Sequence, residues 1–213
     1  MLTFEVVPGR RRVGVLGGTF DPIHTGHLAA ANEVRHQLGL EIVLFIPNRI
    51  PPHKLDRPVT REEDRTAMVR LAVASNPTFD LDTAELDRAG PSYSLETLRG
   101  LRRRYGEDVD LVFMVGIDAL RELHTWHEPD AILAEFGLVV MDRADEGRDG
   151  QVDAFNEVAA HFSNIREQTR IVHVPQLAIS SAEIRRRVRE GAPIRYLVPL
   201  EVEDYIGERG LYR

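Results

Sequence analysis

Short apolar runs alternate with amphipathic segments along most of this chain. A continuous apolar run of this length, bounded by turn residues, is typical of a buried strand. Spacing of apolar residues by three and four positions is typical of a helix that buries one face. The runs that we predict as strands are residues 13–16, 41–46, 79–82, 109–115, 137–141 and 170–174.

Helices are expected between and after these strands. Their predicted ranges are residues 28–38, 61–74, 95–104, 153–161, 181–189 and 201–209. Thr60 with Glu63 has the spacing of a capping box, and Ser94 is expected as an N-cap. Strands that alternate with helices favour a parallel sheet with right-handed crossovers. We therefore predict an α/β fold: a Rossmann-like, doubly wound, largely parallel sheet with helices on both faces.

Length and composition narrow the class of protein. A chain of 213 residues is sufficient for one α/β domain, and 43% hydrophobic with 29% charged residues is typical of a soluble globular protein. We expect a single domain over residues 1–213, with a helical portion from about residue 180 onward packed on it. No apolar run is long enough to cross a bilayer and no signal peptide is evident, so we expect a cytoplasmic protein without a membrane partner.

Charge and the lack of cysteine argue against several functions. The net charge of −7 is unfavourable for a general nucleic-acid surface, so no nucleic-acid partner is expected. The absence of cysteine excludes disulfides, thiolate catalysis and Cys-ligated zinc. We expect a monomer or a small homo-oligomer.

The most informative stretch is residues 17–27, Gly-Gly-Thr-Phe-Asp-Pro-Ile-His-Thr-Gly-His, directly after the first predicted strand. Glycines at such a turn let the backbone approach a ligand closely. A helix N-terminus offers unpaired N–H groups and the positive end of its dipole to an anion. His24 and His27, three residues apart, share one helical face where the helix includes both. The stretch therefore predicts a phosphate site, and without a third ligand a protein-held metal is not expected.

Two later strands are followed by residues of similar chemistry. Gly116 and Asp118 follow the fourth predicted strand, and Ser180, Ser181 and Arg185 follow the sixth. A carboxylate accepts hydrogen bonds from ribose hydroxyls, whereas hydroxyls, N–H groups and a guanidinium bind phosphate. The alternative for Asp118 and the serines is simple helix capping. Because open parallel sheets bind ligands at the carboxyl ends of their strands, we expect these groups to surround one site.

The first motif resembles the His-x-Gly-His signature of the nucleotidyltransferase superfamily. With the other segments it is similar to one family within it, the bacterial nicotinate mononucleotide adenylyltransferases, from about residue 13 to residue 205. One departure is Ala182, where that family usually has threonine or serine. The segments that carry the resemblance are residues 17–27, 51–54, 90–98, 116–120, Trp126 and residues 179–185.

The resemblance implies an enzyme of NAD biosynthesis that transfers AMP from ATP to nicotinate mononucleotide, giving deamido-NAD and pyrophosphate. It implies direct in-line attack, with Mg²⁺ held mainly by the ATP phosphates and with His24, His27 and Arg185 as the catalytic residues. The implied ATP-binding residues are Gly17, Gly18, Thr19, Phe20, His24, His27, Gly116, Asp118, Ser180, Ser181 and Arg185. The implied ligands of nicotinate mononucleotide are Asp21, His53, Lys54, Tyr93, Ser94, Trp126, His127 and Arg143.

Alternatives remain open at this point. Another adenylyl- or cytidylyltransferase of the superfamily, such as phosphopantetheine adenylyltransferase, shares the first motif. A class I aminoacyl-tRNA synthetase-like fragment also carries His-x-Gly-His, and a silent nucleotide-binding regulator would retain the fold. Trp126, the only tryptophan, is either a stacking platform for the nicotinate ring or a core residue.

Overall fold

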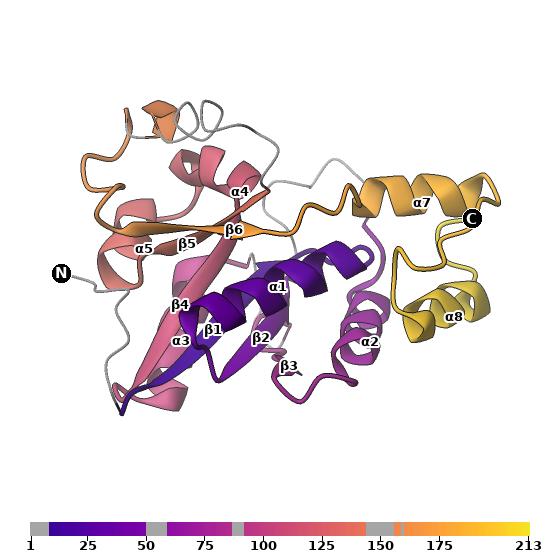
Figure 1. Ribbon diagram of the computed structural model, residues 1–213, viewed down its shortest axis with the longest axis horizontal. Coiled ribbons are helices and arrows are strands. Elements are labelled where there is room, and N and C mark those ends of the chain that lie inside the picture. Colours follow the sequence, from indigo (N-terminus) through magenta and orange to yellow (C-terminus); the bar gives the residue numbers. More distant parts are fainter. Residues whose placement is uncertain (1–8, 50–58, 87–91, 144–155, 159) are drawn as a thin grey trace.

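Parallel strands form one sheet in the order β3-β2-β1-β4-β5-β6 among the residues that the structure describes (Figure 1). This computed structural model describes residues 9–49, 59–86, 92–143, 156–158 and 160–213. The strands are β1 (Arg11–Gly18), β2 (Ile42–Pro47), β3 (Phe79–Leu81), β4 (Val109–Gly116), β5 (Leu138–Arg143) and β6 (Thr169–Val174). Every neighbouring pair is parallel, which confirms the predicted sheet. The order of the strands reverses between β1 and β4, so the topological switch point lies there.

Helices cover both faces of the sheet, as predicted. The helical elements are α1 (Thr25–Leu38), α2 (Glu62–Val73), α3 (Ser94–Tyr105), α4 (Ile117–Arg121), the 3₁₀ turn η1 (Leu123–Thr125), α5 (Pro129–Glu135), α7 (Ser181–Arg189) and α8 (Leu200–Arg209). In Figure 1, α1 crosses the near side of the sheet while α3 and α5 lie behind it. None of the described helices is long and apolar enough to cross a membrane.

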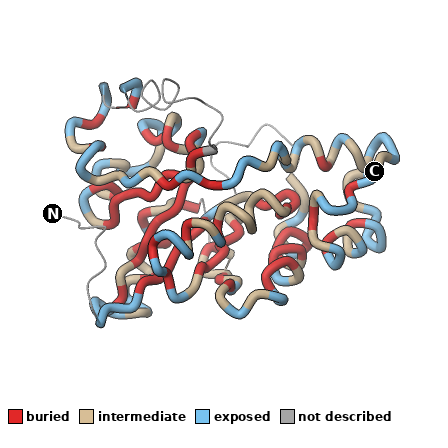
Figure 2. The backbone as a smooth tube through the Cα atoms, in the orientation of Figure 1, coloured by how far each residue is buried: buried red, intermediate tan, exposed pale blue. Residues whose placement is uncertain are grey.

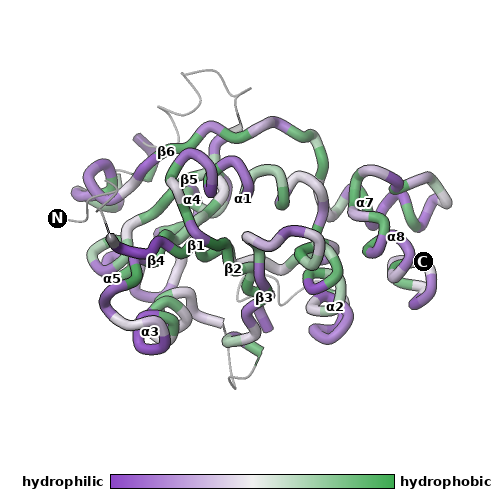
Figure 3. The backbone as a smooth tube through the Cα atoms, turned by 60° about the horizontal axis from the view of Figure 1, so that its bottom comes forward, coloured by the Kyte–Doolittle hydropathy of each residue, from purple (hydrophilic) through white to green (hydrophobic). Residues whose placement is uncertain are grey.

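The central strands of the sheet are buried on both faces, and successive residues of a strand contact opposite faces. On β4, Leu111 and Phe113 pack toward α3, α4 and α5, whereas Val112 and Met114 pack toward α1, α2, α7 and α8. This explains why the strands appear in the sequence as nearly continuous apolar runs. Figure 2 shows the strands as mostly buried backbone, and Figure 3 shows β1 and β2 largely in the hydrophobic colour.

Three predicted helix starts differ from the structure. The capping box between Thr60 and Glu63 is wrong, because α2 begins at Glu62 after an N-cap at Arg61 without a side-chain cap. Thr60 is instead held by tertiary contacts of its main chain: its N–H donates to Asp21 Oδ2 and its carbonyl accepts from Arg65.

The N-cap of α3 is Tyr93 rather than Ser94, which is the first helical residue. The first helix begins at Thr25, three residues earlier than predicted, so that His24 becomes its N-cap. The helix expected at residues 153–161 lies largely outside the described residues, of which residues 156–158 are helical.

The chain from α7 onward lies against the α1 and α2 side of the sheet. Val202 and Ile206 of α8 are buried in the cluster that also includes the buried residues of α2. Tyr205 donates from its hydroxyl to Asp64 Oδ1 at 2.8 Å, which joins α8 to α2 by a polar contact. Just before α8, the carbonyl of Leu197 accepts from the N–H of Thr25 at 2.9 Å and so occupies a donor at the start of α1.

Gly14 of β1 has no room for a larger residue. A Cβ there would lie 2.9 Å from Leu40 Cδ1, 3.0 Å from Met114 Sδ and 3.1 Å from Val43 Cγ2. Because these side chains are buried in a packed cluster, we predict that Gly14→Ala lowers the free energy of unfolding by about 1–3 kcal/mol, measured by urea denaturation. Gly17→Ala on the same strand is the control, since its Cβ would meet no atom within 4 Å. Equal losses of stability in both variants would contradict this account of β1.

Candidate active site

Two cavities open at the carboxyl ends of the strands, one on each side of the sheet's switch point. The Trp126 cavity, of about 240 Å³, is lined by the start of α3 and by the segment around Trp126. The His27 cavity, of about 430 Å³, is lined by α1, by the start of α4 and by residues after β6. Leu16, Gly17, Gly18 and Gly116 line both. The ends of β1 and β4 thus form a shared wall over which two ligands would meet.

Glycine at this shared wall leaves space open rather than filling it. A Cβ on Gly17 or Gly116 would find no atom within 4 Å, although both residues line both cavities. Gly18 is different, because its Cβ would lie 2.8 Å from the ring of Phe20. Gly18 therefore serves packing, whereas Gly17 and Gly116 leave the backbone of the shared wall accessible.

The turn after β1 holds the two histidines in fixed positions. Their rings are stacked, with centroids 3.6 Å apart, and the ring of Phe20 packs edge-on against His27 at 5.3 Å. The N–H of His24 donates to Nδ1 of His27 at 3.2 Å. Since Nδ1 accepts, the ring proton of neutral His27 is carried by Nε2. His27 lines its cavity, whereas His24 is 3% exposed and lines neither cavity.

A buried guanidinium ties the surrounding loops together. Arg65 of α2 is 1% exposed, and this burial lowers its pKa below the usual value for arginine. It donates to main-chain carbonyls in the loops after β1 and β2 and before α2. These carbonyls belong to Thr19, Asn48, Arg49 and Thr60. The bond to Thr19, at 2.6 Å, fixes the backbone beside the shared wall.

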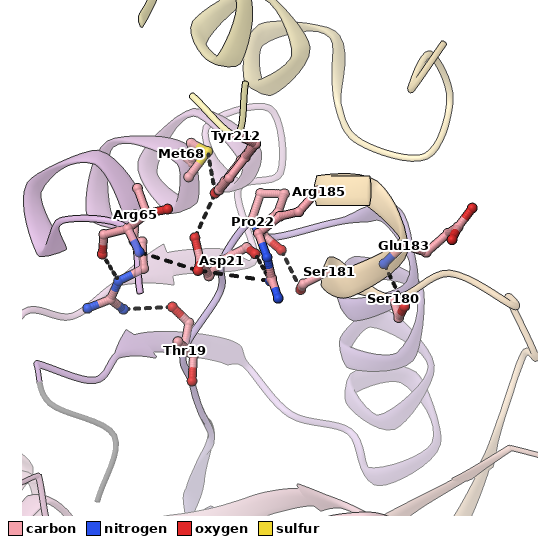
Figure 4. A network of polar contacts seen from close by, with 11 residues as sticks. Thr19, Asp21, Pro22, Arg65, Met68, Ser180, Ser181, Glu183, Arg185 and Tyr212 are labelled. Atoms are coloured by element: carbon pink, nitrogen blue, oxygen red, sulfur yellow. Dashed lines mark hydrogen bonds and ion pairs between the residues drawn. The ribbon is translucent and has the colours of Figure 1, made fainter. Parts of the chain in front are cut away.

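Asp21 lies at the centre of a second network, shown in Figure 4. Its carboxylate is 6% exposed and accepts from the hydroxyl of Tyr212 at 2.7 Å. Arg185 of α7 donates to the main-chain carbonyl of Asp21 at 2.6 Å, and its Nη1 lies 3.9 Å from Asp21 Oδ2. Ser181 donates to the carbonyl of Pro22 at 2.8 Å. The start of α7 is therefore attached to the turn that carries the histidines.

Most of the predicted ATP ligands surround the His27 cavity. Those that line it are Gly17, Gly18, Phe20, His27, Gly116 and Asp118. Asp118 lies in the first turn of α4, and Gly116 is the N-cap, so capping does not explain the aspartate. Ser180 is the N-cap of α7, since its Oγ accepts from the N–H of Glu183 at 3.1 Å. The alternative of helix capping is thus confirmed for this serine.

The predicted ligands of the mononucleotide divide into three groups. Those that line the Trp126 cavity are Tyr93, Ser94, Trp126 and His127, joined there by Thr19 from the ATP set. Asp21 lines neither cavity and is held by Tyr212 and Arg185 instead. His53 and Lys54 lie outside the described residues, and of Arg143 the structure describes only the backbone at the end of β5.

Aromatic rings give the Trp126 cavity its character. The rings of Tyr93 and His127 lie 4.4 Å apart, and those of Trp126 and Phe113 lie 6.1 Å apart. Trp126 is half-buried against the core and also lines the cavity. It is therefore in part a core residue, and its position also allows it to be a stacking platform. Flat apolar faces of this kind accept a planar ring.

Polar residues that the sequence analysis missed also reach the cavities. Asn48 lies two positions after the predicted strand at residues 41–46, and Asp142 directly follows the one at residues 137–141. A search for polar residues at strand ends would therefore have found both. Asp142 is 1% exposed and lies 3.1 Å from Nδ1 of His173. Glu85, 6% exposed, accepts from the hydroxyl of Thr97 at 2.8 Å, and no local pattern marks it. Among the described residues, no three His, Asp or Glu side chains are placed to hold a metal ion.

Comparisons with known proteins show the family of this chain. Residues 15–187 match the family model described as Cytidylyltransferase-like. A relative from Moorella thermoacetica, named "Probable nicotinate-nucleotide adenylyltransferase", is 44% identical over 97% of this chain and 93% of its own length. A relative from Saccharopolyspora erythraea with the same name is 43% identical over 96% of this chain and 91% of its own.

Solved structures share the fold. The nicotinic acid mononucleotide adenylyltransferase of Plasmodium falciparum, complexed with NaAD, superposes with a TM-score of 0.72 at 17% identity. The match covers 95% of this chain and 97% of that one. At this identity the likeness is one of fold alone, and it confirms the predicted α/β architecture.

The role given to Arg65 is open to a direct test. We predict that Arg65→Met lowers the free energy of unfolding by at least about 3 kcal/mol in urea, because several buried carbonyls lose their donor together. Arg70→Met, on the exposed side of the same helix, is the matched control and is expected to change it by no more than about 0.5 kcal/mol. A small effect of Arg65→Met would show that the loops hold their positions without it.

Proposed function

Because the chain belongs to the nicotinate-nucleotide adenylyltransferases of the Cytidylyltransferase-like family, we propose that it transfers the adenylyl group of ATP to nicotinate mononucleotide, a step of NAD biosynthesis. The products are deamido-NAD and pyrophosphate. The observation that carries the proposal is the pair of cavities with a shared wall at the ends of β1 and β4. A reaction between two nucleotides needs two adjoining sites whose phosphates meet.

ATP takes the His27 cavity in this proposal. The carboxylate of Asp118 is 87% exposed and is able to accept the ribose hydroxyls. The N-terminus of α1 lies beside the same cavity and favours negative charge. The triphosphate then lies along Gly17 and Gly18, where the absence of side chains permits contact with the backbone.

Nicotinate mononucleotide takes the Trp126 cavity. The rings of Trp126, Tyr93 and His127 offer flat faces to the pyridine ring. Ser94 at the first position of α3 adds a hydroxyl and an N–H that are suited to the nicotinate carboxylate. This arrangement directs the phosphate of the mononucleotide toward the shared wall.

The chemistry is an in-line displacement. An oxygen of the mononucleotide phosphate forms a bond to the α-phosphorus of ATP, while the bond from that phosphorus to the bridging oxygen breaks and pyrophosphate leaves. The attacking oxygen is already an anion, so a general base adds little. Repulsion between the phosphates and charge growth on the leaving group make the barrier. We assign His27 and Arg185 to stabilise that charge, with His24 holding His27 in place through its N–H and stacked ring.

Enzymes of this kind use a divalent metal, and we propose that it is Mg²⁺, held mainly by the phosphates of ATP. The described residues offer no cluster of three His, Asp or Glu side chains, which suits an ion that arrives with its nucleotide. Such an ion withdraws charge from the phosphate oxygens that it contacts. Cytoplasmic location, a single domain and assembly as a monomer or small homo-oligomer stay predictions from the sequence.

The substrate assignment predicts the outcome of an acceptor panel. With ATP and Mg²⁺, pyrophosphate release is expected with nicotinate mononucleotide and not with phosphopantetheine. Because N–H and hydroxyl donors favour a carboxylate over a carboxamide, kcat/KM should be at least about tenfold lower with nicotinamide mononucleotide. Release with phosphopantetheine alone would move the chain to the other adenylyltransferases, and equal kcat/KM for the two mononucleotides would overturn the assignment of the carboxylate site.

The role of His27 predicts a loss of turnover without a loss of structure. We expect His27→Ala to lower kcat by at least about 100-fold, the usual scale for the loss of a donor to transition-state charge. His36→Ala, an exposed histidine in the last turn of the same helix, is the control and should retain normal kcat. If His27→Ala kept kcat within a few-fold of wild type, His27 would have no part in the chemistry.

A further inference from the structure

The segment after α8 brings a tyrosine back to the turn that carries the histidines. Helix α8 ends at Arg209, and its C-cap, Gly210, adopts a left-handed backbone conformation. The N–H of Leu211 donates to the carbonyl of Ile206 at 3.0 Å. Tyr212 then adopts a positive φ of 65°, which is uncommon for a residue other than glycine. A side chain held in such a conformation needs strong local contacts, and Tyr212 finds them at Asp21.

The contact between Tyr212 and Asp21 is a buried, charge-assisted hydrogen bond. The hydroxyl donates to Asp21 Oδ1 at 2.7 Å and lies 4.0 Å from Met68 Sδ (Figure 4). Burial, and then the negative charge of Asp21, raise the pKa of Tyr212 well above its usual value, so it stays a donor. Tyr212 is 191 residues from Asp21 along the chain.

Asp21 stands between this tyrosine and a cation of the proposed active site. Arg185 Nη1 donates to the main-chain carbonyl of Asp21 but lies 3.9 Å from its carboxylate, beyond hydrogen-bond distance. The side chain of Arg185 is 32% exposed, whereas that of Asp21 is 7% exposed. A buried carboxylate that lost the hydroxyl of Tyr212 would need another donor, and Arg185 is next to it.

We propose that Tyr212 is a positioning residue for Arg185. By donating to Asp21 it satisfies the carboxylate with a neutral group, so that Arg185 stays 3.9 Å from that carboxylate rather than hydrogen-bonding to it, and the guanidinium remains available to the triphosphate. This rests on the proposed function, in which Arg185 meets the phosphates of ATP. Tyr212 itself touches no substrate.

A second tyrosine of the same region provides a matched control. Tyr205 of α8 donates to Asp64 Oδ1 at 2.8 Å, and Asp64 is 5% exposed. The pKa of Tyr205 is also raised, by burial and by the hydrogen bond to Asp64. Asp64 lies 3.3 Å from Arg209 and not beside a cation of the site. Tyr205→Phe therefore removes a similar bond without changing the surroundings of Arg185.

Steady-state kinetics on the full chain test the proposal. Tyr212→Phe is expected to lower kcat/KM for ATP about tenfold, the scale of a lost hydrogen bond to a charged group. KM for the mononucleotide should stay within about twofold of wild type, and Tyr205→Phe should leave both parameters within that range. Equal kinetics of the two variants, or equal changes in both KM values for Tyr212→Phe, would overturn the proposal, because a general loss of packing predicts those results.

A double-mutant cycle identifies the residue through which Tyr212 acts. In an Arg185→Ala background, Tyr212→Phe should cause no further loss, since the guanidinium that it positions is gone. The four proteins of this cycle are also compared by their affinity for inorganic tripolyphosphate, measured by calorimetry. This measurement needs neither the acceptor substrate nor turnover. An additive effect of the two substitutions on binding would reject the coupling.

The binding measurement also separates this inference from the proposed function. If the wild-type protein released no pyrophosphate with any acceptor, the proposed function would fail. The tripolyphosphate cycle would still decide whether Tyr212 acts through Arg185.

Discussion

The loops around the two cavities depend on one buried cation. A guanidinium that is removed from water is stable only when its donors find partners, and Arg65 finds them in main-chain carbonyls of two loops, one after β1 and one between β2 and α2. Neither of these loops can shift alone without leaving a donor or a carbonyl unpaired. The hydrogen bond from Arg65 therefore restrains the backbone at Thr19, next to the shared wall, although Thr19 lies just after the end of a strand.

This restraint matters for the proposed chemistry because phosphoryl transfer gains most from donors that are in place before the substrate arrives. Phe20, directly after Thr19, packs against the ring of His27, and the N–H of His24 fixes the tautomer of that ring. The sheet supplies the rest of the arrangement. Because the strand order reverses between β1 and β4, the helices that follow these strands leave to opposite faces, and a cavity opens on each side of the same glycines.

The centre of the sheet could be predicted from the sequence because β1, β2, β4 and β5 are buried on both faces and thus appear as nearly continuous apolar runs. The short elements α4, η1 and α5 were not predicted, since none is long enough to show a helical period. Local capping rules also failed at Thr60, where tertiary bonds to the backbone took precedence. Gly116, Asp118 and the first motif were found because a strand end is a local feature. Two partners of Asp21, Tyr212 and Arg185, are more than 160 residues away along the chain, and no local pattern encodes them.

A carboxylate next to the proposed phosphate site would repel a triphosphate if it were exposed, and Asp21 is buried. The carboxylate lies between two arginines of different kinds: the donors of Arg65 are committed to carbonyls, whereas Arg185 is partly exposed. Without Asp21 the two cations would repel each other and be harder to bury. With Asp21 bonded to Tyr212, their charges are balanced behind the turn while the guanidinium of Arg185 keeps access to solvent. The fold thereby leaves the partly exposed Arg185, rather than the buried Asp21, as the charged side chain that a bound anion would meet in the proposed function.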